Sequence, residues 1–390
     1  MTDAILVLNA GSSSLKFAVF ETMTGLPLLM KGSITSLRSR PRLRVSNANG
    51  ALDKDDVLGA NAISMRAALE VVVAEIAGRH SLEGIRVIGH RIVHGGHAYR
   101  VATLLDEQAI GALWKLSPLA PIHQPMNLEI VELAASLLPH ARQVGCFDTA
   151  FHSERPRIAT LYGLPQSLTD AGIVSYGFHG VSYGYIASCL LDRYGAQAGN
   201  RAIVCHLGSG ASLCAMREGR SIATTMGFSP LDGLVMSTRC GSLDPGVVLH
   251  LLQDGTRSAN DLARLLYEES GLIGVSEISG DMQTLVESDD ARAAEAVDLF
   301  VYQAGRQIGS LAAALEGLDT LVFTAGIGEN SAVIRERICR AARWLGVQVD
   351  HERNRRGDQL INAAGSTVDV LVIPTDEERA VAKQILASGL

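Results

Sequence analysis

The sequence lacks both a long apolar segment and an excess of positive charge. Nowhere in its 390 residues does an uncharged apolar stretch reach about 18 residues, the length that a membrane span requires, so we expect no membrane partner. Lysine and arginine number 34 against 41 aspartate and glutamate residues, which gives a net charge of −7. Because binding to a nucleic-acid backbone needs a basic surface, this balance argues against a nucleic-acid partner. A few local cations are still enough to bind one nucleotide.

The six cysteines form no C-x-x-C pair, and several of them lie inside apolar runs. This pattern favours buried thiols in a reducing compartment and argues against a zinc site or a disulfide framework. The N-terminal residues Met1-Thr2-Asp3-Ala4 carry no basic segment before the first apolar run, so no signal peptide is expected. These features together predict a cytoplasmic protein. The cysteines are Cys146, Cys189, Cys205, Cys214, Cys240 and Cys339.

Charged residues make up only 19% of the chain, whereas 47% of the residues are hydrophobic. Such a composition is typical of a globular protein and excludes a largely disordered one. A chain of 390 residues is long enough for two domains with separate cores.

The chain has no Walker motif, since GxxxxGK followed by Ser or Thr does not occur. A different kind of phosphate loop is predicted near the N-terminus, where NAGSSSLKF joins an apolar run to an alternating one. Glycine and serine in such a strand–turn–strand let the backbone approach phosphate oxygens closely. Lys16 adds a positive charge, and Asn9 offers a carbonyl oxygen to a metal ion or to its waters.

The same pattern returns at 202–216, where CHLGSGAS again lies between two strand-like runs. Asn9 aligns with His206, Gly11 with Gly208, and Ser12 with Ser209. A third turn, TAGIGENS at 324–331, follows another apolar run. One such hairpin alone is more often an ordinary turn than a binding site, but three of them indicate a duplicated domain with a nucleotide between its halves.

Apolar and alternating runs predict strands, and apolar residues at helical spacing predict helices between them, so we expect α/β layers with mixed sheets. Helices are expected over 62–79, over 297–315 and over 376–390, the last capped by Thr375 with Glu378 completing a capping box. Residues 34–60 are interpreted as a solvated hairpin or loop, and a domain boundary is expected near 151–156. The expected strands are 5–8, 15–20, 87–89, 143–147, 202–206, 212–216, 321–324 and 368–373.

Four charged or titratable residues stand at the ends of strands or in glycine-rich turns. Arg91 lies between two histidines before a Gly-Gly turn, and its planar guanidinium suits a carboxylate or a phosphate. Asp148 ends an apolar strand, and His179 lies between glycine-flanked turns in YGFHG. Arg239 lies in a loop rich in turn formers, where arginine can contact a transferring phosphoryl group. For each one a structural role is open: a surface ion pair, a turn cap, a satisfied histidine or an ordinary loop arginine.

Ten segments taken in order resemble the acetate kinase family of the actin-like ATPase superfamily, from Leu6 to about Arg379. The resemblance implies an α/β fold of duplicated actin-like ATPase (ribonuclease H-like) domains with an interdomain active-site cleft. It implies an N-terminal domain over 1–150, with the helix at 376–390 packing back on it, and a nucleotide-binding and dimerisation domain over 151–375. The segments are NAGSSSLKF, GHRIVHGG, APIHQP, FDTAFH, YGFHG, CHLGSGAS, MGFSPLDGL, TRCGSLDPG, TAGIGEN and IPTDEE.

The resemblance also implies a reaction: reversible transfer of a phosphoryl group from ATP to acetate, which gives acetyl phosphate and ADP. The implied cofactor is Mg²⁺, with Mn²⁺ as a possible substitute, and the implied assembly is a homodimer in the cytoplasm. A propionate or butyrate kinase of the same family is an alternative, because pocket size decides between these acids. A non-catalytic, nucleotide-switched binding protein is a second alternative, although such a protein could dispense with Arg91, Asp148, His179 and Arg239, which are all present.

The family's functional residues are carried over motif by motif. The resemblance implies that Asn9 and Glu377 hold the metal ion, that Lys16 contacts the nucleotide phosphates and that Arg91 binds the acetate carboxylate. The implied catalytic residues are Asp148, His179 and Arg239, and the implied pocket for the acetate methyl group is formed by Val93, Ile122, Phe178 and Pro230. The residues implied to bind the nucleotide are Lys16, Ser12, His206, Leu207, Gly208, Ser209, Gly210, Asp281, Met282, Gln283, Gly326, Ile327, Gly328, Glu329 and Asn330.

Four positions depart from the family pattern. Ser209 stands where an asparagine is usual, and Gln283 stands where an arginine usually contacts the nucleotide. Tyr183 replaces a usual histidine, and Ser242 replaces a usual aspartate. These departures bear on rate and nucleotide choice, and none of them removes one of the implied catalytic residues.

Overall fold

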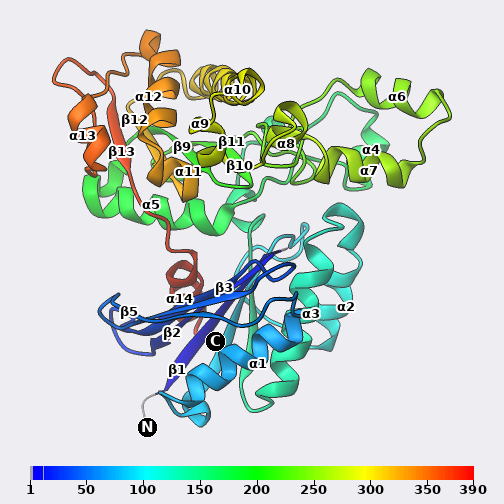
Figure 1. Ribbon diagram of the computed structural model, residues 1–390, viewed down its shortest axis with the longest axis vertical. Coiled ribbons are helices and arrows are strands. Elements are labelled where there is room, and N and C mark those ends of the chain that lie inside the picture. Colours follow the sequence, from blue (N-terminus) through cyan, green and yellow to red (C-terminus); the bar gives the residue numbers. More distant parts are fainter. Residues whose placement is uncertain (1–2, 12) are drawn as a thin grey trace. The chain divides into compact units, whose positions relative to one another are not determined.

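The computed structural model describes residues 3–11 and 13–390, which form two compact units (Figure 1). The first unit comprises residues up to Ser153, together with Gly180–Tyr185 and Asp376–Leu390. The second unit comprises Glu154–His179 and Ile186–Thr375. The chain therefore passes from one unit to the other more than once, and each unit is described separately below.

The first unit is built on an eight-stranded sheet with the order β5-β4-β3-β2-β1-β6-β8-β7. Strand β1 pairs antiparallel with β2 on one side and parallel with β6 on the other, and β6 pairs parallel with β8. The strands are β1 (Ala4–Gly11), β2 (Ser14–Glu21), β3 (Leu28–Thr35), β4 (Arg42–Asn47), β5 (Leu52–Val57), β6 (Ile85–Ile92), β7 (Thr103–Leu104) and β8 (Arg142–Phe147).

Both faces of this sheet are covered, which explains the continuous apolar run in β1. Leu6 and Leu8 pack in a core with α1 (Met65–Ala77) and α3 (Gln124–Leu137). Ile5 and Val7, on the opposite face, pack in a second core with α14 (Glu377–Ser388). Successive side chains of a strand point to opposite faces, so a strand buried on both sides has no polar positions to alternate with. The remaining helix of this unit is α2 (Glu107–Trp114).

Residues 34–60, interpreted from sequence as a solvated hairpin or loop, form a hairpin of β4 and β5 that extends the sheet. Leu43 and Val45 of β4 are fully buried in the core, whereas most of β5 is exposed. The expected cap of the last helix is wrong: α14 begins at Glu377, and the side chain of Asp376 accepts the N–H of Arg379 at 2.9 Å. The helix starts too late for Thr375 to cap it.

The second unit is built on a five-stranded sheet with the order β11-β10-β9-β12-β13. Its strands are β9 (Arg201–Leu207), β10 (Ala211–Arg217), β11 (Arg220–Thr224), β12 (Thr320–Thr324) and β13 (Asp369–Val372). The long helix α10 (Ala291–Leu315) buries the predicted apolar stripe, from Val297 through Ile308 to Leu315. Further helices are α4 (Gln166–Asp170), α5 (Gly180–Tyr194, which begins in the first unit), α6 (Pro245–Gln253), α7 (Ala259–Glu268), α8 (Gly271–Ser276), α9 (Met282–Val286), α11 (Ala325–Asn330), α12 (Ala332–Ala341) and α13 (His351–Arg356).

The two sheets share one pattern of pairing. In each, three strands that follow one another in the chain pair antiparallel, and two later strands add in parallel beside the first of the three. The corresponding runs are β3-β2-β1-β6-β8 and β11-β10-β9-β12-β13. The duplicated α/β architecture predicted from the repeated hairpins is therefore confirmed.

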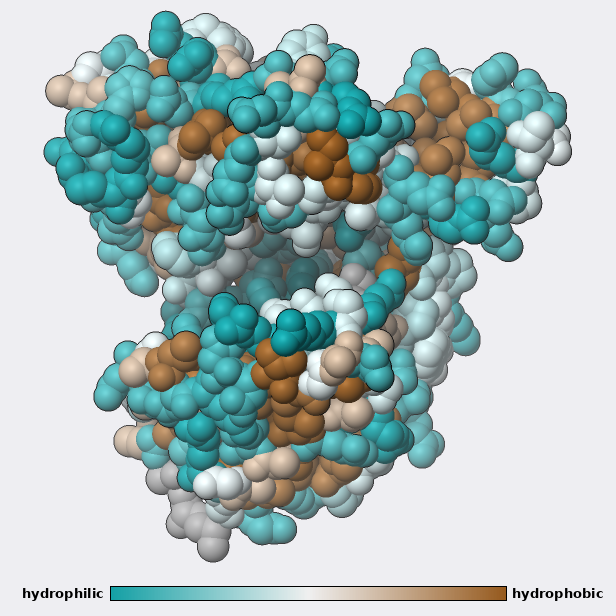
Figure 2. Space-filling view, in the orientation of Figure 1, coloured by the Kyte–Doolittle hydropathy of each residue, from teal (hydrophilic) through white to brown (hydrophobic). Residues whose placement is uncertain are grey.

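Surface and thiol properties follow the composition. Within residues 3–11 and 13–390, no helix combines the length and the apolar character needed to cross a bilayer. All six cysteines lie in the described part of the chain and are free, and burial raises the pKa of Cys146, Cys214 and Cys339 to about 12. Figure 2 shows apolar side chains gathered over α6, where Val247, Leu249 and Leu252 are exposed.

Candidate functional site

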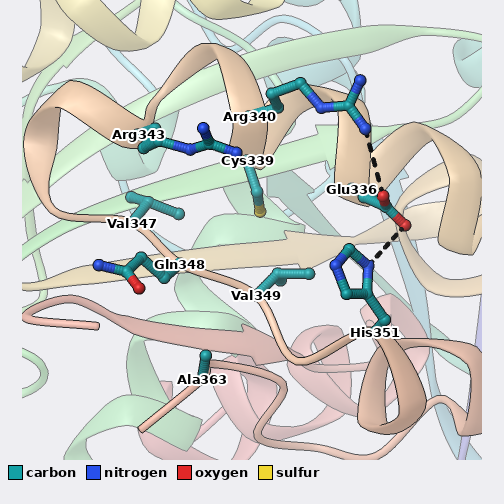
Figure 3. A pocket seen from close by; sticks show the side chains of 9 residues that line it. All are labelled: Glu336, Cys339, Arg340, Arg343, Val347, Gln348, Val349, His351 and Ala363. Atoms are coloured by element: carbon teal, nitrogen blue, oxygen red, sulfur yellow. Dashed lines mark hydrogen bonds and ion pairs between the residues drawn. The ribbon is translucent and has the colours of Figure 1, made fainter. Parts of the chain in front are cut away.

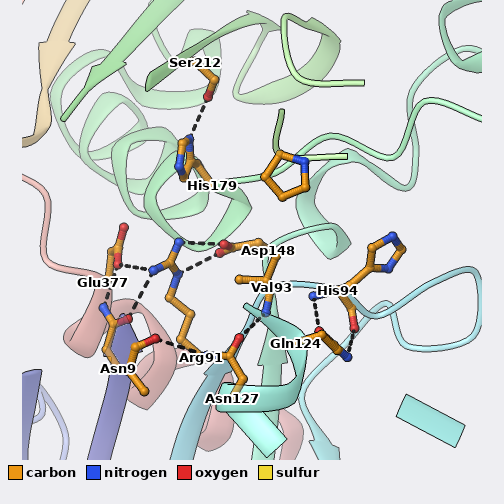
Figure 4. A network of polar contacts seen from close by, with 12 residues as sticks. Asn9, Arg91, Val93, His94, Gln124, Asn127, Asp148, His179, Ser212 and Glu377 are labelled. Atoms are coloured by element: carbon orange, nitrogen blue, oxygen red, sulfur yellow. Dashed lines mark hydrogen bonds and ion pairs between the residues drawn. The ribbon is translucent and has the colours of Figure 1, made fainter. Parts of the chain in front are cut away.

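In the first unit, the ends of β1, β6 and β8 and the start of α14 bring four predicted residues together (Figure 4). Arg91 donates from Nε to Asp148 Oδ1 at 3.0 Å and from Nη2 to Asp148 Oδ2 at 2.6 Å. Its Nη1 donates to Asn9 Oδ1 at 3.2 Å and lies 3.5 Å from Glu377 Oε2. Asn9 Nδ2 in turn donates to Glu377 Oε2 at 2.7 Å and to Glu378 Oε1 at 3.1 Å.

The parallel pairing of these strands places the charged groups. Leu8 on β1 lies opposite His90 on β6, so the next residue of each strand, Asn9 or Arg91, stands at the same end of this pair. Asp148 comes one residue after β8 ends, and its N–H donates to the carbonyl of Ile92 at 2.9 Å. Side chains that follow neighbouring parallel strands meet at the carboxyl edge of the sheet, where ligands of α/β proteins usually bind.

Burial and charge act against each other in this cluster. Burial raises the pKa of Asp148, which is 1% exposed, although its pairing with Arg91 opposes the shift. Burial lowers the pKa of Arg91, but the charges of Asp148 and Glu377 outweigh it, so the pKa of Arg91 is raised. Burial and the charge of Glu377 raise the pKa of Glu378, while Lys16 and Asn9 oppose that shift. Three carboxyl groups around one guanidinium leave an excess of negative charge that favours a cation.

The oxygen atoms of this cluster suit Mg²⁺, but the described protein side chains alone do not form a complete metal site. Among the described residues, no group of three or more His, Cys, Asp or Glu side chains is arranged to hold a metal ion. Mg²⁺ usually takes one or two carboxylates, keeps several waters and binds substrate phosphates. Glu377 and Asn9, whose side chains are in contact, offer oxygens of the kind that such an ion uses.

Two amide side chains on α3 hold the loop that follows Arg91, and sequence reasoning did not single them out. Asn127 Oδ1 accepts the N–H of Val93 at 3.0 Å, and Asn127 Nδ2 donates to the carbonyl of Ala10 at 3.1 Å. Gln124 binds both the N–H and the carbonyl of His94 at 3.0 Å. Both amides are at most 1% exposed. Only a partial signal is present in the sequence: Gln124 lies in APIHQP, and Asn127, three residues later, shares its helix face.

In the second unit, His179 is held at the start of α5 in a left-handed backbone conformation, with φ of 58°. Its Nδ1 lies 2.8 Å from the hydroxyl of Ser212 (Figure 4), and its ring stacks on His206 with centroids 4.2 Å apart. Ser212 pairs with His206 across the β9–β10 hairpin, as Lys16 pairs with Asn9 across the first hairpin. Since Asn9 and His206 align in sequence, this register could have identified Ser212.

The glycine turn between β9 and β10 lies close to two of the predicted catalytic residues. A β-carbon placed on Gly210 would lie 3.4 Å from His179 Nε2 and 3.6 Å from Arg239 Nη1. Arg239 Nη1 also donates to the carbonyl of Pro230 at 3.0 Å, and the N–H of Ser237 donates to the carbonyl of Ser209 at 3.1 Å. The structure therefore brings together Gly210, His179 and Arg239 around a space that suits an anion.

Gly210→Ala is expected to lower kcat for phosphoryl transfer by about tenfold, because its methyl group enters the space between His179 and Arg239. Gly210 has no positive φ, so the backbone accepts alanine and the melting temperature should change little. Steady-state kinetics and a thermal melt measure the two effects. Gly163→Ala, where no atom lies within 4 Å of an added β-carbon, is the control. Unchanged kcat in Gly210→Ala would show that this space is not used.

The third predicted turn forms α11 and lies against the same glycine turn. A β-carbon on Gly208 would lie 3.7 Å from Ala325 Cβ and 4.0 Å from the N atom of Gly326. Glu329 Oε1 accepts the N–H groups of Ala325 at 2.8 Å and Thr375 at 3.0 Å. Glu329 thus fixes the corner between β12 and α11, with its carboxylate turned to backbone groups. Gly326 is exposed, with no atom within 4 Å of an added β-carbon, so the backbone at the start of α11 is accessible to a ligand, whereas Gly328 is buried.

A buried arginine fixes the far end of α11. Arg335, 2% exposed, donates from Nη1 to the carbonyls of Gly328 at 3.0 Å and Glu329 at 2.7 Å. Its Nε and Nη2 donate to the side-chain and backbone oxygens of Asn354 at 2.8 Å. Asn330 Nδ2 donates to the carbonyl of Gly326 at 2.8 Å. The loop of the predicted nucleotide site is therefore held by side chains on both sides.

Other predicted residues are placed less directly. Asp281 caps α9 by accepting the N–H of Thr284 at 2.9 Å, Met282 is buried, and Gln283 Nε2 donates to Glu287 on the same helix. Lys16 is exposed on β2 opposite Asn9. Val93 is 8% exposed and Ile122 half-buried in the first unit, while Phe178 and Pro230 are buried in the second. Leu207 ends β9, Ile327 is half-buried on α11, and Ser12 lies outside the described residues.

A cavity of about 520 Å³ lies elsewhere in the second unit, beside α12 and α13 (Figure 3). Glu336 contacts both Arg340 and His351 at its wall, and Val347 and Val349 add apolar surface. None of the predicted site residues lines this cavity, so it is distinct from the candidate site.

The comparisons with known proteins agree with the motifs. A family model described as the acetokinase family matches residues 4–383. Acetate kinase of Rhodopseudomonas palustris strain TIE-1 is 48% identical over 397 residues, which cover 100% of both chains. A propionate kinase from Francisella tularensis has a TM-score of 0.90 at 32% identity over 98% of each chain. Porphyromonas gingivalis acetate kinase has a TM-score of 0.84 at 33% identity over 99% of each chain.

Proposed function

Because the chain belongs to the acetokinase family, we propose that it transfers the terminal phosphoryl group of ATP to acetate, reversibly and with Mg²⁺. The products are acetyl phosphate and ADP. The observation that supports this proposal is the approach of both His179 Nε2 and Arg239 Nη1 to Gly210, which lies in a turn able to bind phosphate. The enzyme class that follows is a phosphotransferase with a carboxyl group as acceptor.

The reaction needs little acid or base, because acetate is already a nucleophile. One carboxylate oxygen forms a bond to the γ-phosphorus of ATP, the bond from that phosphorus to the bridging oxygen breaks, and the electron pair leaves with ADP. The barrier arises from bringing two anions together and is lowered by positioning and by fixed positive charge. Mg²⁺, held by Asn9 and Glu377 with waters, supplies charge to the nucleotide phosphates when bound.

Arg91, Arg239 and His179 each have a separate task in this proposal. Arg91 presents its guanidinium to the acetate carboxylate, and the two bonds to Asp148 fix the plane of that group. Arg239 binds the transferring phosphoryl group. His179 is assigned its proton on Nε2 in this proposal, so that Nδ1 accepts from the Ser212 hydroxyl 2.8 Å away and Nε2 donates to a phosphoryl oxygen. Asp148 acts through Arg91 and does not need to exchange a proton.

The size of the pocket decides which carboxylic acid is the substrate, and we propose acetate. Val93 is a wall of medium size and is nearly buried, which leaves little room for longer chains. One methylene group in such a pocket changes the free energy of the transition state by about 1–3 kcal/mol. The likeness to a propionate kinase keeps propionate as the acid to compare against.

The purified protein is expected to form acetyl phosphate from ATP, Mg²⁺ and acetate, with kcat/KM about tenfold higher for acetate than for propionate and lower again for butyrate. Trapping the product with hydroxylamine measures each acid. A higher kcat/KM for propionate would make the protein a propionate kinase. Absence of product from all three acids would instead support a nucleotide-switched binding protein. EDTA should abolish product, and excess Mg²⁺ should restore it.

We also propose that the protein works as a homodimer in the cytoplasm. The exposed apolar side chains of α6 support a second copy as partner, because monomeric proteins rarely expose a contiguous apolar patch without a role. Six free cysteines support a reducing compartment. Sedimentation equilibrium tests the assembly, and a mass equal to that of the 41.4 kDa chain would reject it.

A further inference from the structure

Arg155 is a buried guanidinium that the proposed mechanism does not use. It is 6% exposed and stands one residue after the second unit begins at Glu154. Its Nη2 donates to the carbonyls of Ser175 at 2.5 Å and Tyr176 at 2.9 Å, and its Nη1 donates to the hydroxyl of Ser175 at 3.3 Å. Burial lowers the pKa of Arg155 from its ordinary value, so the charged side chain is held here at a cost to folding.

The two carbonyls that Arg155 binds begin the short segment that ends at His179. The same segment is held from a second side, because the N–H groups of Tyr176 and Gly177 both donate to the carbonyl of Gly227, at 2.9 and 3.2 Å. Gly227 is itself tightly packed, because a β-carbon placed on it would lie 2.3 Å from the hydroxyl oxygen of Tyr162. The backbone that enters His179 is therefore fixed in place on both sides.

This fixation matters because the segment is strained at its end. Gly177 and His179 both have left-handed backbone conformations, with φ of 80° and 58°. A histidine adopts that conformation at a cost of about 1 kcal/mol or more, and it persists only where the surroundings fix the chain. The ring of His179 is then located by two contacts, with Ser212 and His206. A shift of the backbone by a fraction of an ångström would move the ring out of both.

We propose that Arg155 is a positioning residue for phosphoryl transfer: by holding the carbonyls of Ser175 and Tyr176, it directs the imidazole of His179 toward Gly210. The inference rests on the proposed function, since it gives His179 a task at the phosphoryl group. In this proposal Arg155 does not contact a substrate, and it acts through the 175–179 backbone that its two carbonyl bonds hold. Removing it should therefore lower the rate of the reaction without weakening the binding of ATP or acetate.

Arg155→Met keeps the unbranched apolar stem of the side chain and removes all its donors. We expect kcat to fall about tenfold or more, with the KM values for ATP and acetate within about twofold of the original. Arg155→Lys keeps the charge and one donor group, so its kcat should lie between those of the original protein and of Arg155→Met. This variant also tests the proposal if the methionine variant does not fold. The matched control is Arg157→Met, an exposed arginine two residues away, with kcat expected unchanged.

A double-mutant cycle separates positioning from a general loss of structure. In a His179→Gln background, Arg155→Met should cause little further loss of kcat, because the residue it positions is already gone. Losses that multiply across the two sites would overturn the inference. The melting temperature of each variant in the cycle is also measured, so that a loss of folded protein is not counted as a loss of rate.

A spectroscopic readout does not depend on activity. The imidazole Cε1–H signal of His179, assigned by its absence in His179→Gln, should shift in Arg155→Met and Arg155→Lys and stay in place in Arg157→Met. An unchanged signal in the Arg155 variants would overturn the positioning role, whatever the kinetics. A wild-type protein that makes no acetyl phosphate would instead overturn the proposed function, and the shift of the signal would still decide whether Arg155 places His179.

Discussion

Arg239→Ala is expected to lower kcat for acetyl phosphate formation by a factor on the order of 10² or more. Arg239 Nη1 lies 3.6 Å from a β-carbon placed on Gly210, so its charge is close to any phosphoryl group bound at this turn. Its contact forms with the phosphoryl group as negative charge is rearranged, so the loss should fall on kcat more than on the KM for ATP. Steady-state kinetics in the direction of acetyl phosphate measures both parameters.

Arg220→Ala removes an exposed arginine of the same unit and is the control for a change in net charge. Equal kcat in the two variants would reject the role of Arg239. Guanidinium ion added to Arg239→Ala should restore part of the rate, since the side chain leaves a space beside the carbonyl of Pro230.

Asp148→Asn is expected to cost both stability and activity. Arg91 would keep its buried position but lose the carboxylate that binds it at 2.6 and 3.0 Å. Removing one partner of a buried ion pair typically destabilises a protein by about 3–5 kcal/mol, because the other charge is left uncompensated. The freed guanidinium would also present acetate in the wrong plane, so kcat/KM for acetate should fall by a factor on the order of 10².

Urea unfolding and acetate kinetics measure the two effects of Asp148→Asn separately. Asp192→Asn, at an exposed position on α5, changes the charge equally and is expected to leave both unchanged. If Asp148→Asn loses stability but keeps kcat/KM for acetate, Asp148 supports the fold and does not orient Arg91 for the substrate.

The sequence predicts the most buried strands of both sheets, because buried β-rich runs bounded by glycine and serine leave few alternatives. Strands β3, β7 and β11 were not expected, and β4 and β5 were interpreted only as a solvated hairpin or loop. The repeated hairpin also predicts the duplication, which the matching order of β3-β2-β1-β6-β8 and β11-β10-β9-β12-β13 confirms. Strand lengths were underestimated, since β6 runs from Ile85 to Ile92 where only 87–89 was expected. The charged residue at Arg86 and the histidine at His90 interrupt the apolar pattern there, although the backbone pairing continues through them.

The long-range bonds that hold the site in place were not visible in the sequence. Gln124, Asn127 and Arg155 act on backbone groups through bonds that join distant parts of the chain, up to 117 residues apart for Asn127 and Ala10. Local patterns carry no information on such pairings, because a buried amide on a helix looks the same whether it binds a loop or a neighbouring side chain. The predicted cap of α14 was wrong for a related reason. Thr375 and Asp376 are both good capping residues, and only the bond from the N–H of Arg379 to the Asp376 side chain distinguishes them.

The free cysteines make the chain convenient for labelling. Thiol reagents attack the thiolate, and burial raises the pKa of Cys146, Cys205, Cys214, Cys240 and Cys339 well away from neutral pH. Cys189 and Cys240, which are both half-buried, need to be replaced first. A fluorescent pair attached at Ser39→Cys in one unit and Ala294→Cys in the other, both at exposed positions, would then report how the separation of the units changes as nucleotide and acid bind.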